Sequence, residues 1–65
     1  MKLVINGDEK EFPQGTSIVS LLDRLGLSPD KVAVELNRRL IRAAQYSNVL
    51  KSGDQIEIVT FVGGG

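Results

Sequence analysis

The 65-residue sequence contains no cysteine and no histidine. These absences exclude disulfides, thiolate nucleophiles, Cys/His zinc sites and acid–base catalysis by imidazole. Eight basic residues balance eight acidic ones, so the chain lacks the positive excess with which nucleic-acid binders displace counterions. No apolar run approaches the roughly 20 residues of a membrane span. The sequence begins directly with a strand-like pattern and no signal peptide, and we expect a cytoplasmic protein.

The composition predicts one small globular domain that is not an enzyme. The chain is 42% hydrophobic and 25% charged, which is typical of a folded protein. Carboxylates remain as formal acid–base groups, but we expect none to sit in an apolar setting that would raise its pKa, and so small a domain has little room for a cleft. We therefore expect no catalytic residues of its own, no bound metal and no bound cofactor.

The first third of the chain predicts a β-hairpin followed by a helix. Residues 3–5 form a β-branched run that ends at Asn6-Gly7, the strongest two-residue hairpin signal, and residues 9–12 return as a second strand. Thr16 or Ser17 caps a helix whose C-terminus is closed by Gly26 in a left-handed conformation. Helical spacing puts four apolar residues on one face, which we interpret as core: Ile18, Leu21, Leu22 and Leu25.

The remaining chain predicts three more strands, at residues 32–36, 40–41 and 55–61. Between the last two, residues 42–49 are expected to form a short helical turn that holds Tyr46 against the edge of the core. Gly53 is expected to adopt a positive φ in a tight turn.

This order of elements predicts an α+β fold of the β-grasp, or ubiquitin-like, type. The helix must bury its apolar face against a mixed sheet of four to five strands, with the first and last strands as central neighbours. We expect residues 1–61 to form the β-grasp domain and residues 62–65 to form a flexible glycine tail.

The last three residues, Gly63, Gly64 and Gly65, have no side chains to pack, and glycine loses more conformational entropy on ordering than any other residue. A bare glycine segment can instead thread a narrow channel in another protein. Residues 62–65 would span at most about 13–14 Å when extended. We therefore interpret the α-carboxylate of Gly65 as the reactive group of the protein.

The whole chain resembles the ThiS family, the bacterial sulfur carriers of thiamine biosynthesis. The resemblance rests on segments that match in order: Asn6-Gly7, Thr16-Ser17-Ile18 with Leu21-Leu22, Val32-Ala33-Val34-Glu35-Leu36-Asn37, Gly53-Asp54, Ile56-Glu57-Ile58 and Val62-Gly63-Gly64-Gly65.

The resemblance implies a role for the tail as a sulfur-carrying co-substrate. A ubiquitin-activating-enzyme-like adenylyltransferase (ThiF-like) would use ATP to adenylate the carboxylate of Gly65. The adenylate would become a thiocarboxylate, whose sulfur goes to a thiazole synthase (ThiG-like). This chain has no phosphate-binding loop, so the activating partner must supply the ATP site. We expect the chain to be monomeric alone.

Strand alternation predicts a docking surface for these partners. If Ile56 and Ile58 face the helix, Val59 and Phe61 point the other way, and Val4 does so on the first strand. Together with Val62, these residues would form an apolar docking patch at the base of the tail. The alternatives are scattered surface residues or a small cluster covered by residues 42–49. We interpret the basic residues Arg38, Arg39 and Arg42 as a solvated face.

Two other functions remain open from the sequence. The chain could be the sulfur-carrying small subunit of molybdopterin synthase or a related carrier, which would use the same tail chemistry. It could also be a ubiquitin-like binding module with an inert tail, or a modifier joined to lysines. Addition of residues after Gly65 would leave an inert module unaffected but would inactivate a carrier or a modifier.

Overall fold

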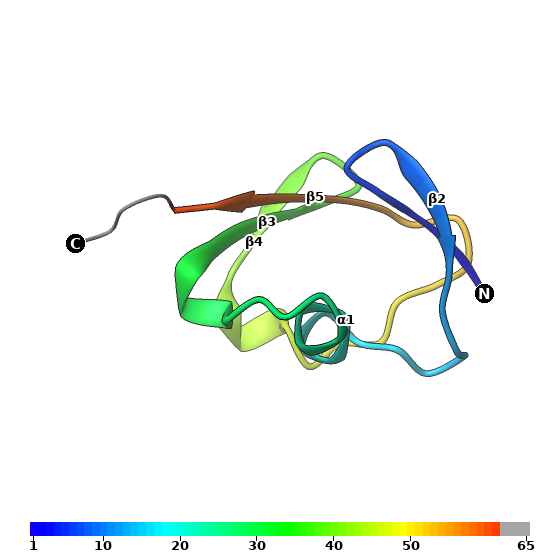
Figure 1. Cartoon of the computed structure of the whole chain (residues 1–65), viewed down its shortest axis with the longest axis horizontal. Coiled ribbons are helices and arrows are strands. Elements are labelled where there is room, and N and C mark those ends of the chain that lie inside the picture. Colours follow the sequence, from blue (N-terminus) through cyan, green and yellow to red (C-terminus); the bar gives the residue numbers. More distant parts are fainter. Residues whose placement is uncertain (62–65) are drawn as a thin grey trace.

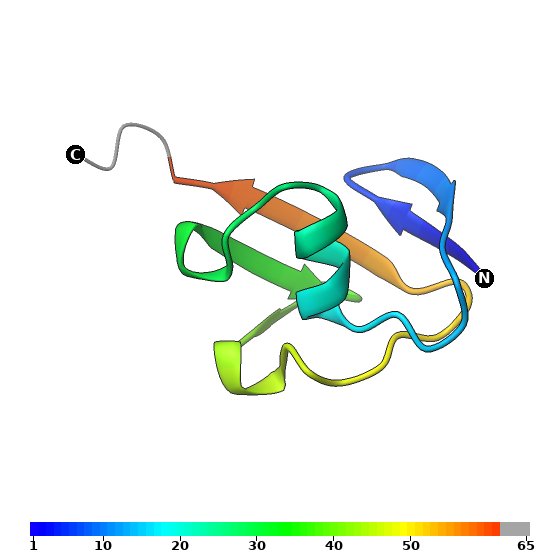
Figure 2. The ribbon, with the colours of Figure 1, turned by 60° about the horizontal axis from the view of Figure 1, so that its bottom comes forward.

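The computed structural model describes residues 1–61, whose strands form one mixed five-stranded sheet in the order β2-β1-β5-β3-β4. Two antiparallel hairpins, β1–β2 and β3–β4, flank β5, which runs parallel to β1 and antiparallel to β3. The helix α1 lies across one face of this sheet (Figures 1 and 2). This is the predicted β-grasp arrangement. The bounds are β1 Lys2–Ile5, β2 Asp8–Glu11, α1 Ile18–Arg24, β3 Val32–Leu36, β4 Arg39–Ile41 and β5 Gln55–Thr60.

Ser17 immediately precedes helix α1 and caps it with its side chain. The Ser17 hydroxyl accepts a hydrogen bond from the Ser20 backbone N–H at 3.2 Å, and the Ser20 hydroxyl accepts one from the Ser17 N–H at 2.8 Å. This reciprocal pair satisfies backbone donors that a helix N-terminus otherwise leaves free. The helix ends before Gly26, whose φ of +73° is the left-handed conformation predicted for it.

The core lies between α1 and the sheet. Three residues of the predicted helical stripe are almost completely buried, and Leu25 is partly buried against them. Burial of each such side chain stabilises the fold by about 1.5–3 kcal/mol, which matters in a chain near the lower size limit for independent folding. The buried apolar residues are Leu3, Ile5, Phe12, Ile18, Leu21, Leu22, Val32, Val34, Tyr46, Leu50, Ile56 and Ile58.

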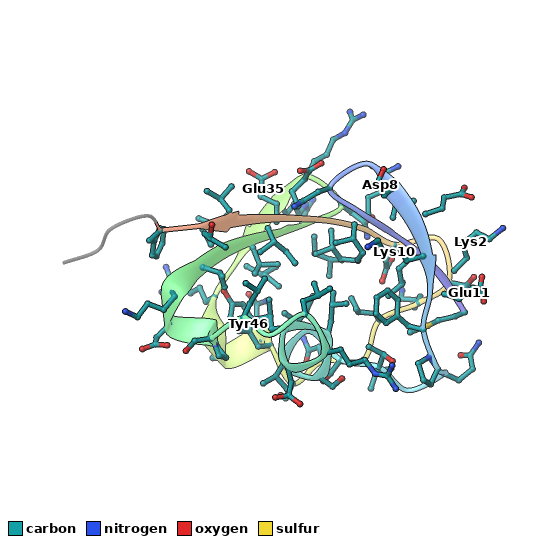
Figure 3. The ribbon with its side chains drawn as sticks, viewed as in Figure 1. Lys2, Asp8, Lys10, Glu11, Glu35 and Tyr46 are labelled. Atoms are coloured by element: carbon teal, nitrogen blue, oxygen red, sulfur yellow. The ribbon has the colours of Figure 1, made fainter. Side chains whose placement is uncertain are left out.

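The segment after β4 closes the core on the helix side. Its short 3₁₀ helix η2, Ala43–Gln45, is the predicted helical turn, and Tyr46 after it is only 6% exposed. The backbone of Tyr46 accepts a hydrogen bond from the Val19 N–H of α1 at 2.8 Å. The segment therefore packs beside the helix, as Figure 3 illustrates for Tyr46, and it does not cover the opposite face of the sheet.

Each strand boundary lies within one residue of the sequence prediction. The second strand runs from Asp8 to Glu11, and Phe12, which follows it, is buried while its N–H donates to the Met1 carbonyl at 2.8 Å. A second 3₁₀ helix, η1, occupies Pro29–Lys31 between α1 and β3. Gly53 has the predicted positive φ, +90°. Within residues 1–61, every helix is too short to cross a membrane.

Candidate functional site: the last strand and the open sheet face

Strand β5 is paired with β3 along most of its length and with β1 only at its start. On one side its register with β3 runs from Leu36↔Ile56 to Val32↔Thr60. The ladder extends one step further, because the Phe61 N–H donates to the Lys31 carbonyl at 2.9 Å. On the other side β1 pairs in parallel through Ile5↔Ile56. The position at which the C-terminal residues leave the domain is therefore fixed by the sheet.

Asn6 continues the β1 side of this pairing with its side chain. Its backbone N–H donates to the Ile56 carbonyl at 2.9 Å, and its Oδ1 accepts from the Ile58 N–H at 2.7 Å. Its Nδ2 donates to the Ile58 carbonyl at 3.2 Å. With its left-handed φ of +49°, Asn6 turns the backbone away from β5, while its side-chain amide remains hydrogen-bonded to that strand. The sequence pattern identified Asn6 as a turn residue only, because Ile58 is 52 residues away.

Asn37 makes a similar connection from the second hairpin. Its backbone N–H donates to the Gln55 carbonyl at 2.8 Å, and its Oδ1 accepts from the Gln55 N–H at 2.9 Å. Its Nδ2 donates to Oδ1 of Asp54 at 3.0 Å, and Oδ2 of Asp54 accepts from the Lys51 N–H at 2.8 Å. The start of β5 is thereby held by the turn between β3 and β4, which contains Asn37, and by the turn of residues 51–54 that precedes β5.

The face of the sheet opposite α1 is not covered by any helix or loop of residues 1–61 (Figures 1 and 2). Strand alternation and register define this open face, which Figure 3 illustrates with the labelled Glu35 pointing away from the helix. It mixes apolar, acidic and basic side chains. The open face consists of Lys2 and Val4 on β1, Glu9 and Glu11 on β2, Ala33 and Glu35 on β3, Leu40 on β4, and Gln55, Glu57 and Val59 on β5.

The predicted docking residues occupy separate parts of the structure. Val59 is 61% exposed and lies opposite Ala33, near the end of β5. Phe61 follows β5 and is 57% exposed. Val4 is partly buried and pairs with Gln55 at the start of β5. Val59 lies four residue steps beyond Gln55 along the strand, roughly 13 Å, so the structure does not bring Val4 to Val59.

The tail itself lies outside the described residues. Val62, Gly63, Gly64 and Gly65 were predicted to carry the docking and the chemistry, and their roles stay predictions. The segment that was the alternative cover for the patch, residues 42–49, lies on the helix side instead.

The described part of the chain offers little for chemistry of its own. Residues 1–61 contain no pocket and no group of three or more side chains able to hold a metal. The side chains of Arg38, Arg39 and Arg42 are exposed and form no ion pair with other residues in this range. One carboxylate is perturbed: the hydroxyl of Ser28 donates to Asp30 and lowers the pKa of Asp30 below its ordinary value of 3.8.

Comparison with known proteins identifies the family. The model of the ThiS family matches residues 3–65. The chain belongs to the ThiS family. The crystal structure of a thiamine biosynthesis protein (ThiS) from Geobacter metallireducens is 29% identical, covers both chains completely and superimposes with a TM-score of 0.82. The NMR structure of a thiamine biosynthesis protein from the same organism, also 29% identical, superimposes with a TM-score of 0.80 over all of this chain and 88% of that one.

The sequence relatives of this ThiS-family chain are of two kinds: much longer proteins that contain a similar segment, and proteins of about the same length. A thiazole synthase of Paramagnetospirillum magneticum is 46% identical over the whole chain, and one of Magnetococcus marinus is 44% identical. The chain spans only 20% of the length of each of these proteins. The uncharacterized protein ycf40 of Pyropia yezoensis is 35% identical, and the chain covers 93% of it.

Proposed function

We propose that this protein is a sulfur carrier for the thiazole moiety of thiamine, and that its cargo is held at the α-carboxylate of Gly65. The observation that carries this proposal is the match of residues 3–65 to the ThiS family, which includes the glycine segment. The similarity to thiazole synthases supports a thiazole synthase (ThiG-like) as the acceptor of the sulfur.

The chemistry requires activation by a partner. A terminal carboxyl group has a reference pKa of about 3.3–3.7, so it is ionised at pH 7 and is a poor electrophile. A carboxylate oxygen of Gly65 attacks the α-phosphorus of ATP, and pyrophosphate leaves. A hydrosulfide ion derived from the sulfur donor then attacks the acyl carbon of the adenylate, AMP leaves, and loss of the sulfur-bound proton gives the thiocarboxylate. The ATP site belongs to a ThiF-like adenylyltransferase.

The chain's own contribution is presentation of this carboxylate. Without cysteine, it cannot hold sulfur as a persulfide, so the terminal carbonyl carbon is the remaining position for it. The pairing of β5 through Phe61 gives partners a fixed reference point next to the tail. We propose that Val59 and Phe61, with Val62, contact these partners, while Val4 contributes at the far end of the open face.

Changes at the end of the chain test this function. Addition of one alanine after Gly65 should abolish thiazole formation in an assay with the activating enzyme, ATP, a sulfur donor and thiazole synthase, because the reactive carboxylate is moved and shielded. Deletion of Gly65 keeps a Gly-Gly end but shortens the reach by about 3.3–3.6 Å. We expect this deletion also to reduce thiazole formation strongly. Full activity of both variants would contradict the proposal.

A further inference from the structure

Two carboxylates face each other at the centre of the open face. Glu35 on β3 and Glu57 on β5 are directly opposite in an antiparallel register, where Cβ atoms are typically about 4.5–5.5 Å apart and like charges destabilise the sheet. Both side chains are exposed. Within residues 1–61 neither forms an ion pair, since the two pairs found there join Glu11 to the N-terminus and Glu9 to Lys2.

Apolar side chains border this acidic pair. Ala33 and Val59 form the next outward-facing pair toward the end of β5, and Leu40, which is 71% exposed, lies opposite Glu35 on the edge strand. Such a surface fits a partner that inserts a lysine or arginine. The cationic head would neutralise both carboxylates while its aliphatic stem packs on the apolar border.

We propose that the open face centred on Glu35 and Glu57 is the docking surface for a cationic side chain of the thiazole synthase. This inference rests on the proposed function and names the contact that the carrier makes with its acceptor. Two named thiazole synthases contain a segment similar to this chain, so in them the domain and the synthase share one polypeptide. Glu57 lies on β5, which leads directly to the tail, so docking here brings the carboxylate of Gly65 to the acceptor.

The charge pattern also selects against a second copy of the chain as the occupant. Two copies meeting face to face through this surface would bring four glutamates together, because the same pair sits at the centre of each. Like-charge contacts of this kind suppress an association. A partner of opposite charge removes the repulsion that the isolated domain carries.

Neutral variants of the two glutamates test the proposal, with Asp23→Asn as the matched control on the helix side. The probe is the thiazole synthase of the same organism, with affinity measured by calorimetry at two salt concentrations. We expect Glu35→Gln and Glu57→Gln each to weaken binding by about fivefold, the effect of losing roughly 1 kcal/mol, and to reduce its salt dependence. Asp23→Asn should bind like the unmodified protein.

A second readout separates docking from a structural role. Removal of the like-charge repulsion should raise the urea midpoint of both glutamine variants while their affinity for the synthase falls. A role in folding alone would move stability and affinity in the same direction. Unchanged affinity, or equal weakening by Asp23→Asn, would overturn the proposal.

Sulfur loading of the variants separates this inference from the proposed function. We expect the activating enzyme to load both glutamine variants at the unmodified rate. Loss of loading with intact synthase binding would assign the surface to the activating enzyme and overturn the inference. If the glutamine variants self-associate, the proposed synthase contact stands only when their affinity for the synthase also falls. Self-association with unchanged affinity for the synthase would overturn the proposal. Failure of the unmodified protein to load at all would refute the proposed function instead.

Discussion

Asn6 and Asn37 bind the backbone of β5 with their side-chain amides, at positions where their own strands have already turned away. Each combines a left-handed φ, +49° and +51°, with an Oδ1 that accepts from a β5 N–H. Asparagine suits such positions because its short side chain tolerates this backbone conformation and bonds to the backbone. At the scale of single residues, the alignment of β5 therefore depends on two side-chain amides.

Substitution of Asn6 tests its role in holding β5. Asn6→Gly keeps the left-handed backbone easily accessible but removes both bonds to Ile58, so we expect a loss of about 1–3 kcal/mol in the free energy of unfolding, measured in urea. Asn6→Asp retains the acceptor and should lose less. Hydrogen exchange of the Ile58 amide should quicken in Asn6→Gly. An unchanged exchange rate would contradict the assignment of this bond.

The lowered pKa of Asp30 should give the stability of the fold a small dependence on pH. The Ser28 hydroxyl, followed by the backbone N–H of Asp30, lowers the pKa of this group in the folded state. The stabilisation is therefore present above the unfolded pKa near 3.8 and is lost as the pH falls through the lower folded value. A carbonyl-detected NMR titration should give Asp30 a pKa below 3.8, and Ser28→Ala should raise it. An unchanged titration in Ser28→Ala would contradict this cause.

At the scale of elements, the turns of the two hairpins can be compared with each other. Both close with two-residue turns whose residues have positive φ: Asn6-Gly7 at +49° and +87°, and Asn37-Arg38 at +51° and +70°. Such turns favour glycine at the second position. Arg38 therefore occupies a conformation that costs an L-residue roughly 1–2 kcal/mol.

Exchange of these turn residues should change stability in opposite directions. We expect Arg38→Gly to stabilise the fold by up to about 1 kcal/mol, and Gly7→Ala to destabilise it by a similar amount. Beyond its two neighbours in the chain, no residue lies within 4 Å of the position that an alanine Cβ would take at Gly7, so the second effect isolates backbone strain from crowding. Urea unfolding measures both. Destabilisation by Arg38→Gly would mean that the arginine side chain makes a compensating contact.

The elements were predictable from sequence where the pattern is local. The helix stripe, its serine cap, Gly26 and the strand Val32–Leu36 all follow from spacing and turn chemistry and were confirmed. What the pattern could not supply was register. Alternation correctly turned Val4 and Val59 outward, but only the pairing of Val4 with Gln55 reveals that they lie far apart. The Glu35–Glu57 pair was missed for the same reason, because the two residues are distant in sequence.

The packing of α1 on the sheet is the second test at this scale. Leu21 is completely buried between the helix and the strands, so Leu21→Ala should cost about 2–5 kcal/mol through lost burial and a residual cavity. Val19→Ala, on the same helix but 42% exposed, serves as the control and should cost far less. Equal losses in urea unfolding would contradict the assignment of the buried face.

At the scale of the whole molecule, the domain is divided between a covered face and an open one. The helix, the 3₁₀ segments and Tyr46 all gather on one side of the sheet (Figures 1 and 3). On the other side of the sheet, no helix or loop of residues 1–61 covers β5 between β1 and β3 (Figure 1). The family, the fold and the tail chemistry were all suggested by the sequence, because the matching motifs span the entire chain.

The central claim is that sulfur is carried on the terminal carbonyl of Gly65, and the mass of the intact protein tests it most directly. After incubation with the activating enzyme, ATP and a sulfur donor, the mass should rise by the difference between one sulfur and one oxygen atom, and fragmentation should locate the change at Gly65. Omission of ATP should prevent it. An unchanged mass with a demonstrably active enzyme, or a change located within residues 1–61, would contradict the account.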